Sequence, residues 1–225
     1  MDSHELGERF IKKLGEPPYY IDDVSVVFID MVAFSSLRGS SGMQTVVEDM
    51  QAALWAILDP NYYWDETQKA KPNRIIVIPT GDGYAIAFHP RVDRREVLKR
   101  VDSIYIRLAL ENKLEIRIGV SRGPHIVFID MNSNLNIIGE GIIRAQRAMM
   151  LAAPGQILCS GEFADGVQHE IQEGTLTALD GEWRVKNEKP FKLFVYTNLY
   201  GEKREKRRIG VDSQPDDQFK VVKAG

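Results

Sequence analysis

Short runs of mostly apolar residues recur along the chain and predict strands, several of them buried on both faces. The runs cover 24–30, 75–79, 83–88, 114–121, 124–130, 156–160, 175–185 and 189–199. Six of them form three consecutive pairs, each joined by a short polar or glycine-containing turn, which is the pattern of a β-hairpin. The second of these hairpins would turn around Gly123, where a glycine precedes Pro124.

Other segments place an apolar residue at every third or fourth position, which predicts helices with one buried face. These helices would cover 43–58, about 93–108, 139–152 and 161–171. Asp59-Pro60 stops the first, and Asp93 with Glu96 has the spacing of a capping box at the start of the second. Residues 33–42 are expected to form a small-residue turn, and 60–73 a polar loop.

Helices thus alternate with strand pairs, which favours an α/β or α+β sandwich with a mixed sheet. No glycine-rich dinucleotide or P-loop pattern occurs, so a Rossmann domain is not expected. We expect one domain at 21–200, an N-terminal appendage at 1–20 with a short polar helix, and a mobile polar tail at 201–225. A chain of 225 residues with 44% hydrophobic composition can bury a sizeable core in one such domain.

Charge and cysteine content narrow the functional classes. The net charge of −3 weighs against a stable nucleic-acid complex, and the basic run at 203–208 is interpreted as part of a solvated tail. No stretch approaches the roughly 18 apolar residues that span a bilayer, and the N-terminus lacks the pattern of a signal peptide. The single cysteine, Cys159, excludes an internal disulfide and is expected to be buried. These features predict a cytoplasmic protein without a membrane partner.

Two carboxylates are the candidates for chemistry. Asp30 ends the first predicted strand, and Asp82 occupies the tip of the first hairpin between Gly81 and Gly83. If this hairpin pairs beside the first strand, both side chains reach one edge of the sheet. Close carboxylates repel each other unless divalent cations neutralise them, and such cations also clamp a polyphosphate. The alternative is that Asp82 is a common turn residue and Asp30 a strand-end acid.

Four motifs in order resemble the catalytic domains of class III nucleotidyl cyclases. They are VVFIDMVAFSSL (26–37), PTGDGYAIAF (79–88), IRIGVSRG (116–123) and IIGEGIIRAQRAMMLAAPGQILCS (137–160). The resemblance extends over residues 24–198. It implies an α+β fold of the class III cyclase type, in which a mixed sheet with a ferredoxin-like palm is flanked by helices.

The resemblance also implies roles for individual residues. Asp30, Asp82 and the main-chain carbonyl of Met31 would bind two divalent cations, Mn²⁺ or Mg²⁺, as cofactors. The groups that would hold the phosphates of a nucleoside triphosphate substrate are Phe34, Ser35 and Lys186, with Lys189 nearly as well placed as Lys186. Arg147 would stabilise the transition state from the other subunit, so the resemblance implies a homodimer with composite active sites.

The chain departs from the family where a purine base is read. Ile78 stands at a position that is polar in purine cyclases, Asn136 at a second base-reading position, and Ile143 where an asparagine contacts the ribose. An asparagine amide could pair with uracil or, after a flip, with cytosine. This pattern resembles the bacterial pyrimidine cyclases of Pycsar antiphage systems. It implies UTP, rather than CTP, as substrate and a cyclic product that acts on a separate effector protein.

Two alternatives remain open at this stage. One is a purine cyclase with an unusual base pocket, and the other is an inactive cyclase-like domain that binds a nucleotide and acts as a regulator. Asp130 ends a second IVFIDM-like run but is followed by Asn132-Ser133-Asn134, so we interpret it as a strand-end or turn acid.

Overall fold

The structure is a computed structural model, and it describes residues 19–32, 40–58, 75–112, 114–132, 134–171, 174–185, 190–198 and 219–222. Its helices are α2 (Ser40–Leu58), α3 (Arg94–Tyr105), which continues as the π-helical turn η3 (Ile106–Glu111), α4 (Glu140–Leu151) and α5 (Gly161–Ala164). Its strands are β1 (Tyr19–Met31), β2 (Ile75–Pro79), β3 (Gly83–Phe88), β4 (Ile116–Ile129), β5 (Leu135–Gly139), β6 (Ile157–Ser160), β7 (Thr175–Ala178), β8 (Glu182–Val185), β9 (Leu193–Thr197) and β10 (Phe219–Val222).

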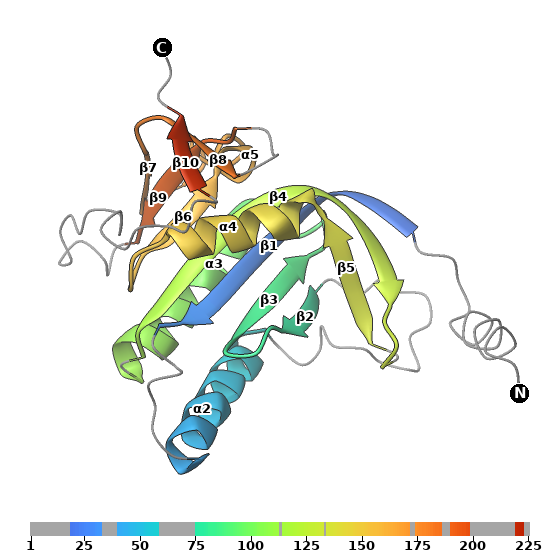
Figure 1. The fold of residues 1–225 in the computed structure, drawn as a ribbon, viewed down its shortest axis with the longest axis vertical. Coiled ribbons are helices and arrows are strands. Elements are labelled where there is room, and N and C mark those ends of the chain that lie inside the picture. The colour runs from blue at the N-terminus through green and yellow to red at the C-terminus, as the bar shows by residue number, and fades with distance from the viewer. Residues whose placement is uncertain are drawn as a thin grey trace, which may run out of the picture.

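One large sheet organises the molecule (Figure 1). Its strands follow the order β2-β3-β1-β4-β6-β9-β7, and β5 pairs with the far part of β4. All neighbours are antiparallel except β4 and β6, which are parallel. The expected α+β fold with a mixed sheet flanked by helices is therefore confirmed.

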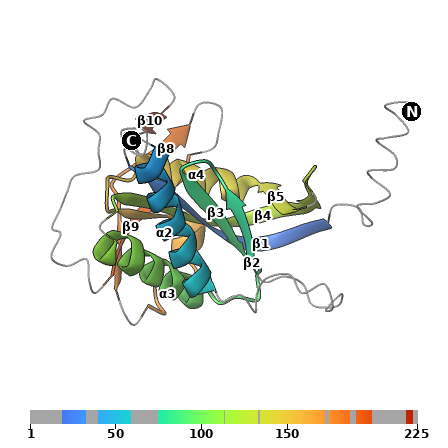
Figure 2. The same cartoon turned by 90° about the horizontal axis from the view of Figure 1, so that it is seen from below.

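The two faces of the sheet carry separate cores because side chains alternate along each strand. From β1, Val27 and Ile29 join a cluster with residues of α2 and α3, whereas Val26 and Phe28 join a cluster with α4 on the opposite face. Figure 2 shows α3 and α4 on opposite sides of the sheet. Buried Cys159 belongs to the first of these cores, as expected.

The hairpin predicted around Gly123 is wrong. β4 runs without a break from Ile116 to Ile129, and the chain turns later, before β5, which was not predicted. A Gly-Pro pair usually marks a turn. Here Pro124 lies opposite an irregularity in β1 between Ile21 and Val24, so it is not paired with a residue of β1. Because no N–H is required for a hydrogen bond to β1 at this position, a proline is tolerated within the strand.

Several element ends also differ from expectation. α2 begins at Ser40, so residues 40–42 are helical rather than part of a turn, and α5 ends at Ala164 rather than at 171. The reciprocal half of the capping box is absent, because Glu96 pairs with Arg100, although Asp93 does cap α3.

The last predicted hairpin, formed by the runs 175–185 and 189–199, has a more complex structure than the apolar pattern indicated. Its first arm divides into β7 and β8 at Gly181, which has a φ of +89°. β9 pairs with β7 and β6, while β8 pairs with β10, a strand at 219–222 within the tail that was expected to be mobile. The predicted helix at the N-terminus (before residue 19) and the loop at 60–73 lie outside the described residues. None of the described helices is long and apolar enough to cross a membrane.

Candidate functional site

Asp30 is the second-to-last residue of β1, which lies between β3 and β4 in the sheet. It is opposite Gly83 of β3 on one side and Arg117 of β4 on the other. The β2–β3 hairpin pairs beside β1, as the interpretation of the two carboxylates required. Because Asp30 alternates with Ile29, it projects to the face of the sheet that α4 covers.

The turn that carries Asp82 is tied to the end of β1. The N–H of Met31 donates to the main-chain oxygen of Asp82 at 3.3 Å, and the N–H of Thr80 donates to the carbonyl of Gly83 at 3.0 Å. Gly81 has a φ of +94°, a left-handed conformation that other residues rarely adopt. The glycine before Asp82 is therefore a requirement of this turn.

Gly83 is required for a different reason, namely space. A Cβ atom on Gly83 would lie 2.0 Å from the carbonyl oxygen of Ile29 and 3.1 Å from the Cα of Asp30. Only a residue without a side chain allows the hairpin to approach β1 this closely. The Gly-Asp-Gly sequence thus places the Asp82 backbone directly beside the end of β1.

The electrostatics of Asp30 show that the two acids interact. Burial, with an exposed side-chain fraction of 13%, is the main cause that raises the pKa of Asp30, and the charge of nearby Asp82 raises it further. Arg117 opposes this effect, because its Nε and Nη2 both lie 2.7 Å from Oδ2 of Asp30. In this site, a nearby acid disfavours the charged form of Asp30 and a guanidinium partly compensates for it.

The carboxylates of Asp30 and Asp82 and the nearby main-chain oxygens are groups that suit hard divalent cations. Carboxylate and main-chain carbonyl oxygens are the ligands that Mg²⁺ and Mn²⁺ prefer. Within the part of the chain that the structure describes, no cluster of three or more acidic, histidine or cysteine side chains could hold a metal. Cations bound here would need Asp30, Asp82, main-chain oxygens such as that of Met31, and oxygens of a phosphate ligand.

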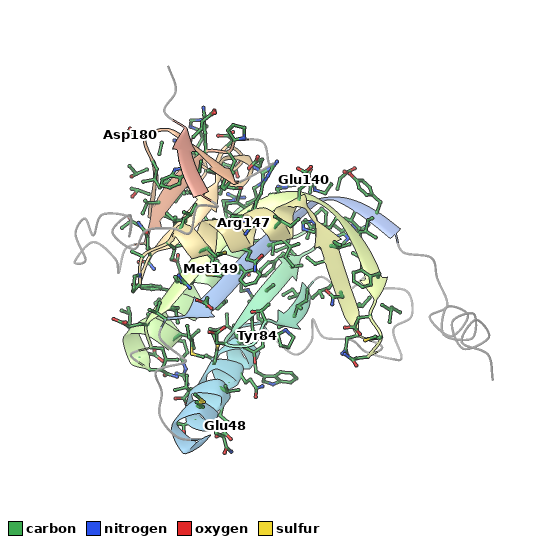
Figure 3. All side chains as sticks on the ribbon, viewed as in Figure 1. Glu48, Tyr84, Glu140, Arg147, Met149 and Asp180 are labelled. Atoms are coloured by element: carbon green, nitrogen blue, oxygen red, sulfur yellow. The ribbon has the colours of Figure 1, made fainter. Side chains whose placement is uncertain are left out.

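Arg147 lies on α4, between Glu140 at the start of the helix and Met149 (Figure 3). Its side chain is partly buried, with Nε fully enclosed. Arg144, one turn earlier, forms ion pairs with Glu140 at 3.0 Å and with Glu162. Arg144 thus has a structural role in linking α4 to α5.

The two candidate base-reading residues lie on strands β2 and β5. Ile78 is half-buried and packs against the apolar cluster under α4, which includes Ile137. Asn136 precedes Ile137, and its Oδ1 accepts a hydrogen bond of 2.8 Å from the Ile137 N–H. In this arrangement Ile78 offers no hydrogen-bonding group, and the amide oxygen of Asn136 is engaged by its own strand.

The remaining predictions divide into two groups. Phe34, Ser35, Lys186 and Lys189 lie outside the described residues. Asp130 is a turn acid, as expected, because its Oδ1 accepts from the N–H groups of Asn132 at 2.8 Å and Asn134 at 3.0 Å. The repeat of the IDM sequence therefore does not repeat the site.

Arg117 was missed from the sequence. The signal was present, because Arg117 is the only charged residue in the mostly apolar run 116–121. Its partner could not be inferred without the register of β4 against β1, which brings residues 87 positions apart into contact.

Comparisons with known proteins identify the fold. No family model and no curated protein matches the sequence. Among solved structures, the adenylyl cyclase CyaB from P. aeruginosa is similar with a TM-score of 0.66 and 15% identity over 81% of this chain and 97% of that one.

Two guanylyl cyclase domains are also similar. The catalytic core of a rhodopsin-guanylyl cyclase with converted specificity, in complex with ATPαS, gives a TM-score of 0.64 with 17% identity over 81% of this chain and 99% of that one. A non-canonical dimeric guanylyl cyclase domain of the RhoGC fusion protein from the aquatic fungus Blastocladiella emersonii gives 0.55 with 20% identity over 80% and 97%. The protein therefore has the fold of adenylyl and guanylyl cyclase catalytic domains.

Proposed function

We propose that the protein is a nucleotide cyclase, which converts a nucleoside triphosphate into its 3′,5′-cyclic monophosphate and pyrophosphate. One observation carries this proposal. In a chain with the cyclase fold, Asp30 and Asp82 come together at the edge of the sheet where β1 ends, close enough for Asp82 to raise the pKa of Asp30. Two adjacent acids are costly for a structural site, but they are useful for binding cations and a triphosphate.

The chain's own groups would divide the work as follows. Asp30, Asp82 and the Met31 carbonyl would hold two Mn²⁺ or Mg²⁺ ions, which when bound lower the pKa of the ribose 3′-hydroxyl and neutralise phosphate charge. The 3′-oxygen forms a bond to the α-phosphorus, its proton passes to solvent, and the bond to the bridging oxygen breaks as pyrophosphate leaves. Arg147 would donate forked hydrogen bonds to the α-phosphate, a role comparable to an arginine finger, which contributes about 10³–10⁵ in rate.

The proposal includes a homodimer with composite sites. In it, Asp30 and Asp82 of one subunit would face Arg147 of the other, so a single chain would not complete a site. A guanylyl cyclase domain with this fold is described as a non-canonical dimer, which supports the formation of a dimer. Phe34, Ser35 and Lys186 are proposed to contact the phosphates.

The proposed base is a pyrimidine, with UTP preferred to CTP. Support comes from Ile78, whose apolar side chain cannot hydrogen-bond a purine edge but could narrow the pocket for a smaller base. Asn136 would read the pyrimidine if its amide exchanges the local hydrogen bond to Ile137 for one to the base. The purine alternative has support of its own, because the similar solved domains are adenylyl and guanylyl cyclases.

The biological role proposed with the pyrimidine product is antiphage signalling, in which the cyclic nucleotide activates a separately encoded effector protein. Expression of the wild-type chain together with that effector should protect bacteria from phage, and Asp30→Asn should remove the protection. Equal protection by both would contradict a role for the product.

The activity test uses the purified protein with ATP, GTP, UTP or CTP and Mn²⁺, followed by chromatography of the products. Wild type is expected to form cyclic UMP, with less cyclic CMP, and Asp30→Asn or Asp82→Asn should form none. Asp130→Asn is the matched control, since it removes a turn acid from a nearly identical sequence and should retain activity. A cyclic purine would refute the proposed base, and no product from any nucleotide would refute the enzyme.

A further inference from the structure

His125 is an enclosed polar side chain that the proposed chemistry does not use. It lies on β4 opposite Gly139, the last residue of β5, and its exposed fraction is 1%. Its Nδ1 is 2.9 Å from the carbonyl oxygen of Gly123, and the N–H of Ile142 donates to its Nε2 at 2.9 Å. A carbonyl only accepts hydrogen bonds, so Nδ1 carries the proton and Nε2 presents its lone pair, which defines a neutral ring.

The hydrogen bond from Ile142 gives His125 a capping role on α4. Ile142 belongs to the first turn of the helix, where N–H groups have no partner within the helix. The N-cap residue is Gly139, which has no side chain to accept from these groups. A residue of another element, the imidazole on β4, therefore supplies the acceptor that the helix itself lacks.

The glycines of the β5–α4 junction fit around this ring. A Cβ on Gly141 would lie 2.4 Å from Cε1 of His125, and a Cβ on Gly139 would lie 2.8 Å from its Cα and 2.3 Å from the carbonyl oxygen of Pro124. The first turn of α4 thus rests directly on the ring. The ring therefore fills the space that a side chain at residue 141 would need.

A second close contact holds the later turns of α4 against the same strand. A Cβ on Gly119 would lie 2.0 Å from the carbonyl oxygen of Ala145 and 2.3 Å from the N of Met149. β4 therefore fixes α4 at two points, at Ile142 through His125 and near Ala145–Met149 through Gly119. Arg147 lies between residues 145 and 149 on this helix (Figure 3).

We propose that His125 is a positioning residue, whose neutral ring sets the placement of α4 and thereby the placement of the Arg147 guanidinium in the reaction. This inference rests on the proposed function, because it assigns Arg147 to catalysis. Placement matters because an error of about 1 Å in a catalytic group can reduce the rate by about 10²-fold. A protonated ring would present an N–H to the Ile142 N–H and a positive charge to the positive end of the helix.

The surroundings of the ring favour its neutral form. Burial lowers the pKa of His125, and the Gly123 carbonyl opposes this only in part. The charged groups on the elements packed against it are Glu140, Arg144 and Arg147 on α4 and Asp22, Asp23 and Asp30 in β1, and none of these is a cause of the lowering. The ring therefore behaves as a buried neutral acceptor rather than as a member of an ion pair.

The test compares His125→Leu, which removes the acceptor, with His125→Gln, whose amide oxygen can replace Nε2 without titrating. His125→Leu should lower kcat about 10- to 100-fold with little change in KM, and His125→Gln should restore most of kcat and make it less sensitive to acid below about pH 6.5. Hydrogen exchange at residues 141–143 should rise in the Leu variant only. His169→Gln, at an exposed histidine, is the control and should match wild type.

A second arm does not depend on the stability of His125→Leu. Gly141→Ala places a methyl group against the ring and should lower kcat, whereas the same substitution added to His125→Ala should cause a much smaller further loss, because only the 3.1 Å contact with the Gly123 N remains. A folded His125→Leu variant with wild-type kcat, equal Leu and Gln variants, or independent losses at 125 and 141 would overturn the inference. A wild-type protein without cyclase activity would instead refute the proposed function, and the assigned role would fall with it.

Discussion

Among single residues, Arg117 compensates the negative charge of Asp30 before any ligand binds. Its guanidinium contacts the same carboxylate that is proposed to bind cations, at 2.7 Å. A partly buried acid beside a second acid needs such a partner, because an uncompensated buried charge is destabilising. A cation that binds Asp30 would take over this compensation, so Arg117 and the metal would act as alternative partners.

The first prediction concerns this exchange of partners. Arg117→Ala should lower the free energy of unfolding by about 1–3 kcal/mol in EDTA, because it leaves Asp30 without its ion-pair partner. The loss should shrink in saturating Mn²⁺. Urea denaturation with and without the metal measures both values. Arg107→Ala, which breaks an exposed pair with Glu111, should cost under about 0.5 kcal/mol in either condition. An equal loss for Arg117→Ala in both conditions would argue against cation binding at Asp30.

The second prediction concerns the glycine after Asp82. Gly83→Ala should lower the free energy of unfolding by about 2 kcal/mol or more and abolish activity, since its Cβ would overlap the backbone of Ile29. Gly42→Ala is the matched control, because nothing lies within 4 Å of that Cβ in α2, and it should be neutral or stabilising by about 0.5 kcal/mol. Thermal unfolding and the cyclase assay test both. A fully active, stable Gly83→Ala protein would contradict the close approach of hairpin and strand.

Sequence reasoning reached Asp30 and Asp82 because strand ends and Gly-Asp-Gly turns are local features. It did not reach Arg117 or His125, because their roles depend on the register of β4 against β1 and on the packing of α4. His125 shows this most clearly, since nothing in the neighbouring sequence indicates that its ring accepts a hydrogen bond from the N–H of Ile142, 17 residues later in α4.

Among elements, α2, α3, α4 and the β2–β3 hairpin were predicted well, because their signals lie within a few consecutive residues. β4 was not, since a Gly-Pro pair is a strong local turn signal and only its partner strand explains why the chain continues. The irregularity in β1 between Ile21 and Val24 accommodates Pro124. β10 also escaped prediction, because a four-residue strand in a polar tail is defined only by its pairing with β8.

The third prediction concerns α4 and pH. Because burial lowers the pKa of His125 in the folded protein, the unfolded chain binds more protons in acid. This contribution to stability is therefore fully present above pH 6.5 and is lost as the pH falls through the lowered pKa, with a slope of at most about 1.4 kcal/mol per pH unit. Between pH 7.5 and 5.5, wild type should lose more stability than His125→Gln in urea denaturation. Parallel curves for the two proteins would show that His125 is not a buried neutral group.

At the scale of the whole molecule, the class of fold followed from the sequence because alternating helices and strand pairs permit few arrangements. The strand order did not, since it depends on which edges pair across long separations. The proposed two-fold assembly is a property that neither a single chain nor its sequence displays directly. It follows only from the roles proposed for Asp30 and Arg147.

The fourth prediction concerns this assembly. Asp30→Asn and Arg147→Ala should each be inactive as homodimers. Mixing the two variants under conditions that exchange subunits should restore up to about one intact site in each mixed dimer, because the wild-type Asp30 and Arg147 then face each other. The cyclase assay after mixing measures the recovery, with Asp30→Asn mixed with Asp82→Asn as the control that cannot recover. No gain over this control would argue that the site is not shared.

The most direct test of the central claim is the anomalous scattering of Mn²⁺ in crystals of the wild-type protein with a non-reactive nucleoside triphosphate analogue. We expect two manganese peaks, about 3.5–4 Å apart, at the end of β1, with oxygens of Asp30 and Asp82 in contact with both ions. Both peaks should disappear in Asp30→Asn crystals. Manganese bound elsewhere, or Asp30 and Asp82 without a shared ion, would contradict it.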